Sequence, residues 1–450
     1  ESEQLFLFSA NSTFSHLTKP LLAVAFLSSF GSSMLYGYNL AVVNSPAEYI
    51  KDFYNETMVE RYDWIPDEEL LTVLYALTVS IFAIGGMTGA LLVGRLVTTY
   101  GRKGTLVRVT LLVFIGGALM GFSRRCRMPA MVILGRFITG VHSGISLSVV
   151  PMYLGEIAPK NLRGFLSLVP SIHICVGVFI AQVLGLSELL GKEEYWPLLL
   201  SLVVFPTIVQ LMLLPWFPES PRYLLIEKGN IPATISALKW YRPKGNFQAE
   251  VDEMQEEQRS LSSVQTVSVW GLLRDRCCFT IERLGRRPLM IGGFLFMGLC
   301  CSGITVSVIL QAELPFMRYI SVGCVVGIIA GFCIGPGGVP FLITAELFKQ
   351  SHRPAAYTVA GCLNWLSNFT IGFVFPFLEN ATGPYCYLIF CVICLGVAVY
   401  TIFVIPETKN KTFMEISQMF AAKNNIPEEE LTSNAHLKMA MMNGYGTLVE

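Results

Sequence analysis

Three charged motifs occur twice in this chain, in the same order, between stretches that are otherwise apolar. The first copy reads Gly101-Arg102-Lys103, then Glu156 and Arg163, then Pro218-Glu219-Ser220-Pro221-Arg222. The second reads Gly285-Arg286-Arg287, then Glu346 and Arg353, then Pro406-Glu407-Thr408. The first and last motifs lie about 120 residues apart in each copy, which predicts two duplicated halves of one fold. Duplicated halves are typical of alternating-access membrane transporters, so transport becomes the leading hypothesis.

The composition restricts the environment in which such a fold can exist. Of 450 residues, 53% are hydrophobic and only 14% are charged, which is too apolar for a soluble protein of this size. The formal net charge is zero, so the chain offers no overall basic surface for nucleic acid. We therefore predict an all-α integral membrane protein whose surroundings are the lipid bilayer.

Ten apolar stretches are long enough to cross about 30 Å of hydrocarbon. They begin near Leu21, Leu71, Thr105, Pro129, Phe165, Trp196, Pro288, Tyr319, Pro354 and Pro384. We predict a cytoplasmic N-terminal segment at 1–20, a six-helix bundle at 21–217, a cytoplasmic helical linker at 218–287, a four-helix bundle at 288–405 and a cytoplasmic tail at 406–450. This topology places most loop Lys and Arg residues inside, with both termini cytoplasmic. The triplet at Arg124, Arg125 and Arg127 disagrees with it, because these arginines fall outside.

The two halves differ in length. About 80 apolar-rich residues precede the first Gly-Arg-Lys motif, whereas about 60 polar ones lie between Tyr223 and the second copy. Two helices are therefore expected to be missing from the second half. The alternative to a transporter is a transport-defective isoform, or an incomplete gene model, that at most regulates a full-length carrier. The chain begins at Glu1 without a leader, so we expect the first membrane helix to direct targeting.

The duplicated charges are candidates for gating salt bridges at the cytoplasmic ends of the helices. Arg pairs bidentately with carboxylates, so such pairs can hold helix ends together in one state and release them in another. Ordinary positive-inside charge is the alternative for any single residue. With the intramembrane Arg136 added, the candidate set is Arg102, Arg136, Glu156, Arg163, Glu219, Arg222, Glu282, Arg286, Glu346, Arg353 and Glu407.

Amide side chains inside the predicted spans are candidates for substrate contact. They are Asn39, Asn44 and Gln182 in the first half, and Asn364 and Asn368 on either side of Trp365. Amides donate and accept hydrogen bonds without charge, which suits a neutral polyol or a flat heterocycle. Hydrogen bonding between helices is an equally good explanation for any one of them.

Other residue types carry weaker signals. Asn55 begins an Asn-Glu-Thr glycosylation sequon in the long first outer loop. The five histidines are scattered, so we expect no metal site, no cofactor and no enzyme constellation. No phosphate-binding loop of an ATP pump occurs.

With these motifs the chain resembles the sugar porter branch of the major facilitator superfamily, in particular the animal facilitative hexose transporters of the fructose and urate class. The residues that carry the resemblance are Ile138-Thr139-Gly140 through Gly144, Tyr153, Glu156, Arg163, Pro218 to Arg222 and Pro406-Glu407-Thr408. It implies a major facilitator fold in the plasma membrane, a hexose or urate as the small-molecule substrate, and uniport. Proton symport is disfavoured because Asn39 stands where proton-coupled members have an aspartate. The oligomeric state is left open.

The departures from the family pattern bear on the substrate. Ser171 replaces a glutamine that hexose carriers usually have, and Phe341 replaces a tryptophan typical of glucose carriers. Both weaken glucose against fructose or urate, and both positions join the amides and Trp365 in the predicted binding site. The family's main sugar-binding helix is among the two expected to be absent. Urate is an anion, so Arg136 or a protonated histidine near the cavity would favour it, whereas fructose would rely on the amides.

Overall fold

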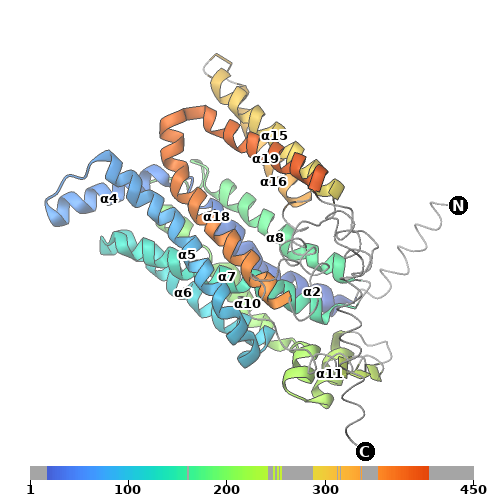
Figure 1. Ribbon diagram of the computed structural model, residues 1–450. Helices are drawn as coiled ribbons and strands as arrows, with labels where there is room; N and C mark the ends of the chain where they lie inside the picture. The colour runs from blue at the N-terminus through green and yellow to red at the C-terminus, as the bar shows by residue number, and fades with distance from the viewer. Residues whose placement is uncertain are drawn as a thin grey trace, which may run out of the picture.

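The computed structural model describes residues 18–159, 162–241, scattered positions between 247 and 255, 287–334 except 312 and 315, residue 336, and 353–404. These residues form helices joined by short connections (Figure 1). The first half contains α2 (Lys19–Ser28), η1 (Ser29–Ser33), α3 (Met34–Ala41), α4 (Ala47–Tyr62), α5 (Glu68–Tyr100), α6 (Arg102–Cys126), α7 (Pro129–Ile157), α8 (Arg163–Leu184), α9 (Trp196–Ser201), α10 (Val204–Leu213) and η2 (Leu214–Trp216). The linker contributes η3 (Tyr223–Glu227) and α11 (Ile231–Tyr241), and the second half α15 (Arg287–Leu310), α16 (Met317–Ile334), α18 (Arg353–Thr382), η4 (Gly383–Tyr385) and α19 (Cys386–Val404).

The predicted all-α membrane fold is confirmed. Seven candidate spans are long and apolar enough to cross a membrane within the described residues, and the last of them runs through both α18 and α19. Shorter apolar helices at Leu168–Leu184 and Met317–Phe332 complete the set expected from the sequence. The described part of the second half has four long helices, α15, α16, α18 and α19, at the four predicted places.

The first half forms one closely packed bundle because small residues let its helices approach. On α5 and α7 the glycines face each other: a β-carbon at Gly85 would overlap the Phe137 carbonyl, and one at Gly140 would overlap the Phe82 carbonyl. Gly37 of α3 and Gly177 of α8 form a second seam of this kind. Side chains longer than hydrogen would separate these helices.

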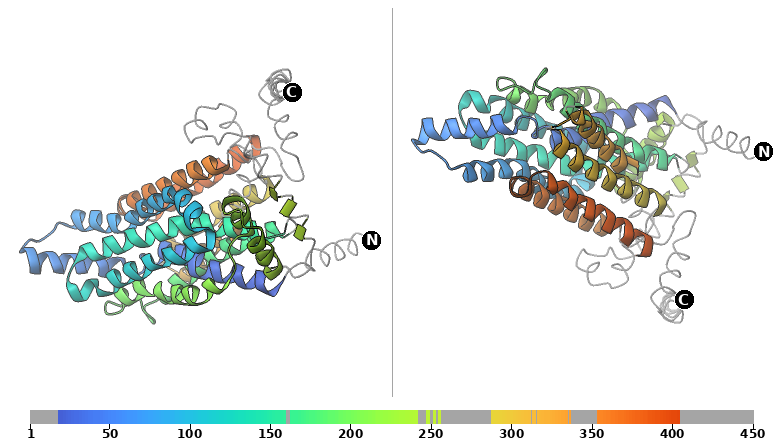
Figure 2. Two further views of the ribbon diagram at one scale, coloured as in Figure 1. Left: turned by 90° about the horizontal axis from the view of Figure 1, so that it is seen from below. Right: turned by 90° about the horizontal axis from the view of Figure 1, so that it is seen from above.

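The second half lies beside this bundle (Figures 1 and 2). Helices α15, α16 and α19 pack against one another, whereas α18 lies along α5 of the first half. Helix α18 is therefore the main connection between the two groups of helices that the structure describes. This arrangement places the residues of α18 against the centre of the first bundle.

One prediction about local structure was wrong. The first outer segment, which holds the Asn55 sequon, is the helix α4 and not a loop. Asn55 is half-buried there, and the Thr57 hydroxyl is buried and donates to the Phe53 carbonyl at 2.7 Å. The polar composition of 47–62 concealed the helix because it lacks the long apolar run on which the spans were predicted.

Candidate functional site

The start of α6 is held by a carboxylate from the linker. Gly101 joins α5 to α6 with φ +79°, a conformation that favours glycine. The Glu219 carboxylate accepts hydrogen bonds from the backbone N–H groups of Arg102 at 3.0 Å, Lys103 at 2.9 Å and Gly104 at 3.0 Å. These N–H groups have no partner inside the helix, and the positive end of the helix dipole favours the negative charge. Glu219 thus ties the linker to the end of the first bundle.

Arg102 makes the central ion pairs of the same region. Its Nη2 lies 2.8 Å from Oε1 of Glu156, and its Nη1 lies 2.6 Å from Oε1 of Glu227. The guanidinium also covers the ring of Tyr223, with 5.3 Å between Cζ and the ring centroid. Ser220 donates a further hydrogen bond to Glu156. One arginine therefore connects α6, the end of α7 and η3.

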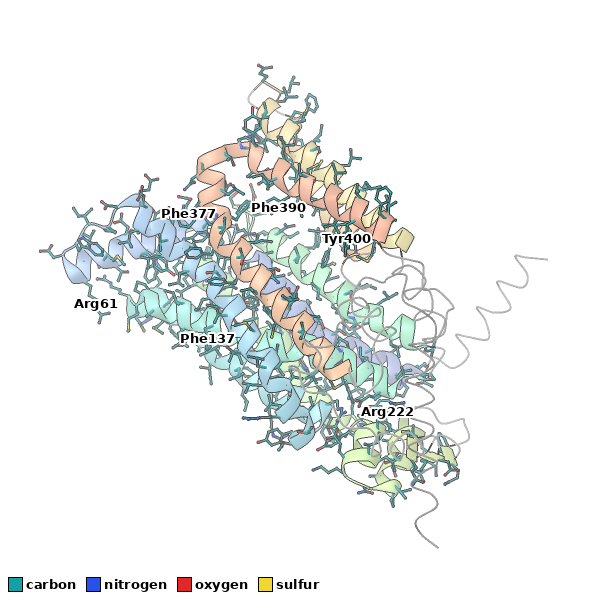
Figure 3. The ribbon with its side chains drawn as sticks, in the orientation of Figure 1. Arg61, Phe137, Arg222, Phe377, Phe390 and Tyr400 are labelled. Atoms are coloured by element: carbon teal, nitrogen blue, oxygen red, sulfur yellow. The ribbon has the colours of Figure 1, made fainter. Side chains whose placement is uncertain are left out.

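Two tyrosines extend the connection to α11. The hydroxyl oxygens of Tyr153 and Tyr241 lie 2.6 Å apart and share a hydrogen bond, and the carbonyl of Pro218 is the acceptor within reach of both, at 2.7 Å and 2.8 Å. Burial raises the pKa of Tyr241, so its hydroxyl stays protonated over the physiological range. These contacts lie at the end of the molecule where Figure 3 labels Arg222, and Arg61 marks the opposite end. We call Arg102, Glu156, Glu219, Glu227, Tyr153 and Tyr241 the linker-end cluster.

Arg136 lies apart from the linker-end cluster, on α7 inside the first bundle, and it does not form the expected salt bridge with a described residue. It is 1% exposed, and the five ion pairs among described residues do not include it. Its Nη1 donates to the Asn39 carbonyl at 2.7 Å, and its Cζ lies 4.6 Å from the centroid of the Phe82 ring. Asn39 is near the end of α3, whose last carbonyls carry partial negative charge. A helix end and an aromatic face take the place of the predicted carboxylate.

An aromatic and amide cluster forms where α18 meets the first bundle. The Trp365 ring is buried and makes edge contacts with Tyr36 of α3 and Phe82 of α5, at centroid distances of 5.6 Å and 5.9 Å. The Tyr36 hydroxyl is within hydrogen-bonding reach of the side chains of Asn364 and Asn368. Asn364 is exposed and Asn368 half-buried, so their amides line an accessible surface beside a buried aromatic floor. We call these residues the interface cluster.

The other predicted binding residues lie outside this cluster. Asn39 is buried, and its side-chain amide donates to the Leu35 carbonyl at 2.9 Å. The backbone carbonyl of Asn39 accepts the hydrogen bond from Arg136. Asn44 is exposed in the turn after α3. Ser171 and Gln182 are half-buried on α8, which packs along α3.

Several predicted residues cannot be placed. Phe341, Glu282, Arg286, Glu346 and Glu407 lie outside the described residues, and of Arg163 and Arg353 only the helical backbone is described. The ion pairs expected at the end of the second half are therefore untested. Arg222 lies near the linker-end cluster, and its positive charge attracts the Glu156 carboxylate.

Sequence reasoning missed four partners. Glu227 was not separated from the many other acidic residues of the linker. Tyr36 and Phe82 carried no motif, although an aromatic residue three positions before Asn39 could have suggested a shared helix face. Tyr241, at the end of a short polar-flanked helix, gave no signal.

The family model described as "Sugar (and other) transporter" matches residues 24–278 and 266–420. This chain belongs to that sugar transporter family. The membership places it among transporters and not among enzymes.

Sequence relatives cover nearly the whole chain. Human solute carrier family 2, facilitated glucose transporter member 9, is 42% identical over 474 residues, which include 92% of this chain and 88% of the relative. Facilitated glucose transporter member 5 of Bos taurus is 40% identical over 470 residues, with 91% and 94% covered.

A solved structure shows the same fold. The xylose transporter XylE from E. coli, in an inward-open conformation, aligns with a TM-score of 0.70 and 20% identity, covering 89% of this chain and 99% of that chain.

The alignment also bears on the expected missing helices. Since 92% of 450 residues is about 414, about 60 of the 474 positions aligned with the human relative have no residue in this sugar transporter. The family match also divides into two parts that meet at 266–278, in the region where the sequence predicted the loss. Both observations agree with an internal segment shorter than in the relatives.

Proposed function

We propose that this protein is a facilitative uniporter that carries a hexose across the membrane down its concentration gradient. Support comes from its membership of the sugar transporter family and from relatives named facilitated glucose transporters. We infer that the membrane is the plasma membrane and that both termini are cytoplasmic, because the basic loops favour that orientation.

The interface cluster is the observation that carries the substrate proposal. Asn364 and Asn368 offer donors and acceptors on an accessible surface, and Tyr36 and Trp365 supply an aromatic floor and a hydroxyl. Sites of this kind suit a sugar, whose hydroxyls need hydrogen bonds and whose C–H faces pack on rings. Asn39, Asn44, Ser171, Gln182 and Phe341 remain candidates for further contacts.

The charge of the site supports a neutral substrate. The guanidinium of Arg136 is buried and directed at the Asn39 carbonyl and the Phe82 ring, so it does not face an accessible surface. An anion such as urate would therefore find no contact with Arg136 in this conformation. We propose fructose before glucose, given Ser171 and Phe341, and retain urate as the competing substrate.

The proposed mechanism is a rocking of the two halves about this site. The contact of α18 with α5 joins the two halves beside the site, and the linker-end cluster holds the ends of α6 and α7 against the linker. Breaking the Arg102 ion pairs would release these ends. Substrate then shifts an equilibrium that exists without it, and needs no energy source for downhill flux.

Uptake by proteoliposomes tests this proposal. Purified protein should equilibrate labelled fructose, independently of a pH gradient, and unlabelled fructose should compete. The Asn364→Ala/Asn368→Ala variant should lose at least about tenfold in rate, while Thr370→Ala, an exposed position on the same helix, should transport normally. If the protein carries none of fructose, glucose and urate while remaining folded, the proposed function is wrong.

A further inference from the structure

A groove opens on the surface of the first bundle between α6 and α9–α10, and no step of the proposed transport uses it. Its volume is about 750 Å³, and its walls include Phe114, Phe122, Pro197, Leu198 and Val204. Phe122 and Leu198 are 58% and 48% exposed. The groove therefore presents apolar surface outward from a membrane-spanning helix.

Glycines create the floor of the groove. Gly117 and Gly121 of α6 lie against the next helices, since a β-carbon on Gly117 would stand 2.5 Å from Cγ2 of Val204 and one on Gly121 would stand 3.2 Å from Cβ of Ser201. Ala118 also lines the groove and is exposed. The glycines let α9 and α10 approach α6 closely and so form the bottom of the groove, and the small side chain of Ala118 leaves it open to the outside.

Charges of both signs stand at one end of the groove. Arg124, Arg125 and Glu194 all line it. Arg124 is neutralised by Glu193, with 2.7 Å between Nη2 and Oε1. Arg125 and Glu194 are exposed, and neither is in an ion pair among the described residues. The positive Arg125 and the negative Glu194 are therefore both available to bind a ligand at the rim of the groove.

The groove runs along α6 from the end of a membrane span toward its middle. Gly121 precedes Arg125 by four residues and Gly117 by eight, so the floor extends about 6 to 12 Å below the arginine at 1.5 Å per helical residue. Arg125 lies near the end of the span Arg102–Cys126, where lipid headgroups meet water. The charges are thus at headgroup level, and the apolar walls are at the level of the first acyl carbons.

We propose that this groove is a binding site for one phosphatidylcholine molecule. The phosphate accepts hydrogen bonds from the Arg125 guanidinium, and the choline ammonium lies near the Glu194 carboxylate. One acyl chain occupies the depression over Gly117 and Gly121. The pair of opposite rim charges selects a zwitterionic headgroup over an anionic one, and the site also accounts for Arg125, one of the three arginines that break the positive-inside pattern of the sequence.

Native mass spectrometry of the purified full chain tests the proposal by counting bound lipid. Dioleoyl phosphatidylcholine should be retained at one copy, more strongly than phosphatidylglycerol with the same chains or than dioleoylglycerol. Arg125→Gln should weaken phosphatidylcholine binding about fivefold. Its matched control is Arg127→Gln, because Arg127 pairs with Glu60 away from the groove.

Two further variants separate the parts of the site. Ala118→Phe should fill the groove from its exposed side and abolish retention, whereas Leu111→Phe, exposed on the same helix outside the groove, should have no effect. Glu194→Gln should lower the ratio of retained phosphatidylcholine to retained phosphatidylglycerol. Equal retention by wild type, Arg125→Gln and Ala118→Phe would mean annular lipid only and would overturn the proposal. Equal retention of dioleoylglycerol would overturn the headgroup contacts.

Discussion

The indole ring of Trp365 on α18 lies directly over Gly86 on α5, so close that a β-carbon at Gly86 would overlap the ring. Tyr36 and Phe82 enclose the same ring from the first half. This contact joins residues 279 positions apart in the chain and brings the two halves together beside the exposed amide of Asn364. A movement of one half against the other must therefore change the surroundings of the proposed substrate site.

Gly86→Ala should separate α18 from α5. The added methyl group has no space beneath the indole, so we expect the contact to lose about 1–3 kcal/mol and the uptake rate to fall. Gly94→Ala is the matched control, because nothing lies within 4 Å of a β-carbon there on the same helix. For each variant, the uptake rate measures transport, and the thermal unfolding midpoint in detergent measures the loss of stability. If the two variants behave alike, the contact does not matter for transport.

Arg102→Lys should weaken the linker-end cluster although it keeps the charge. A lysine ammonium cannot make the two separate contacts that the guanidinium makes with Glu156 and Glu227, nor cover Tyr223 as well. We expect a loss of about 2 kcal/mol in unfolding free energy. Arg124→Lys, at the exposed pair with Glu193, should cost less than about 1 kcal/mol. Equal losses would contradict a special role for Arg102.

The sequence predicted the helices and most, but not all, of the residues in the linker-end cluster, for reasons that differ between residues. Apolar runs located the spans because burial in lipid requires them. The repeated motifs identified Arg102, Glu156 and Glu219, which the structure brings together. Glu227 was hidden because charge alone does not distinguish one linker glutamate from another.

The interface cluster could not be predicted in the same way. Trp365 and its amides were named, but their partners Tyr36, Phe82 and Gly86 depend on how two distant helices pack. Arg136 was assigned a carboxylate because ion pairs are the usual solution for a charge in a membrane. The end of α3 supplies carbonyl oxygens instead, and a sequence does not show where a helix end will point.

Glu219→Gln should loosen the start of α6. A neutral amide can still accept from some of the N–H groups of Arg102, Lys103 and Gly104, but it loses the favourable interaction of a negative charge with the helix N-terminus. We expect a loss of about 1–2 kcal/mol, which chemical denaturation in detergent can measure. Glu193→Gln, at the exposed opposite end, is the control and should change stability by less than half as much. No difference between them would mean that water replaces the carboxylate at this helix start.

Arg136→Met should destabilise the protein more than Arg136→Lys. Lysine retains a positive charge for the end of α3, whereas methionine leaves the Asn39 carbonyl without its 2.7 Å partner in a buried place. We expect losses of about 2–4 kcal/mol for methionine and about half of that for lysine. Arg95→Met, at an exposed position of α5, should change stability by less than about 0.5 kcal/mol. The reverse order, with methionine the more stable, would show that burying the charge costs more than its contacts return.

Tyr241→Phe should detach α11 from the first bundle while leaving the helices of that bundle intact. The change removes the hydrogen bonds of the Tyr241 hydroxyl to Tyr153 and to the Pro218 carbonyl, and we expect a loss of about 1–2 kcal/mol. Hydrogen exchange of the amides in 231–241 should speed up in this variant and not in Tyr195→Phe, whose tyrosine is exposed.

The same hydroxyl predicts a pH dependence. Burial raises the pKa of Tyr241, so the folded state favours the protonated form. Its contribution to stability is complete below the ordinary tyrosine pKa of about 10 and is lost as pH rises toward the folded value. Exchange in α11 of the wild type should therefore remain slow at pH 9 and accelerate only at strongly alkaline pH, while Tyr241→Phe should lack this alkaline step. An alkaline step of equal size in both proteins would place its origin in another group.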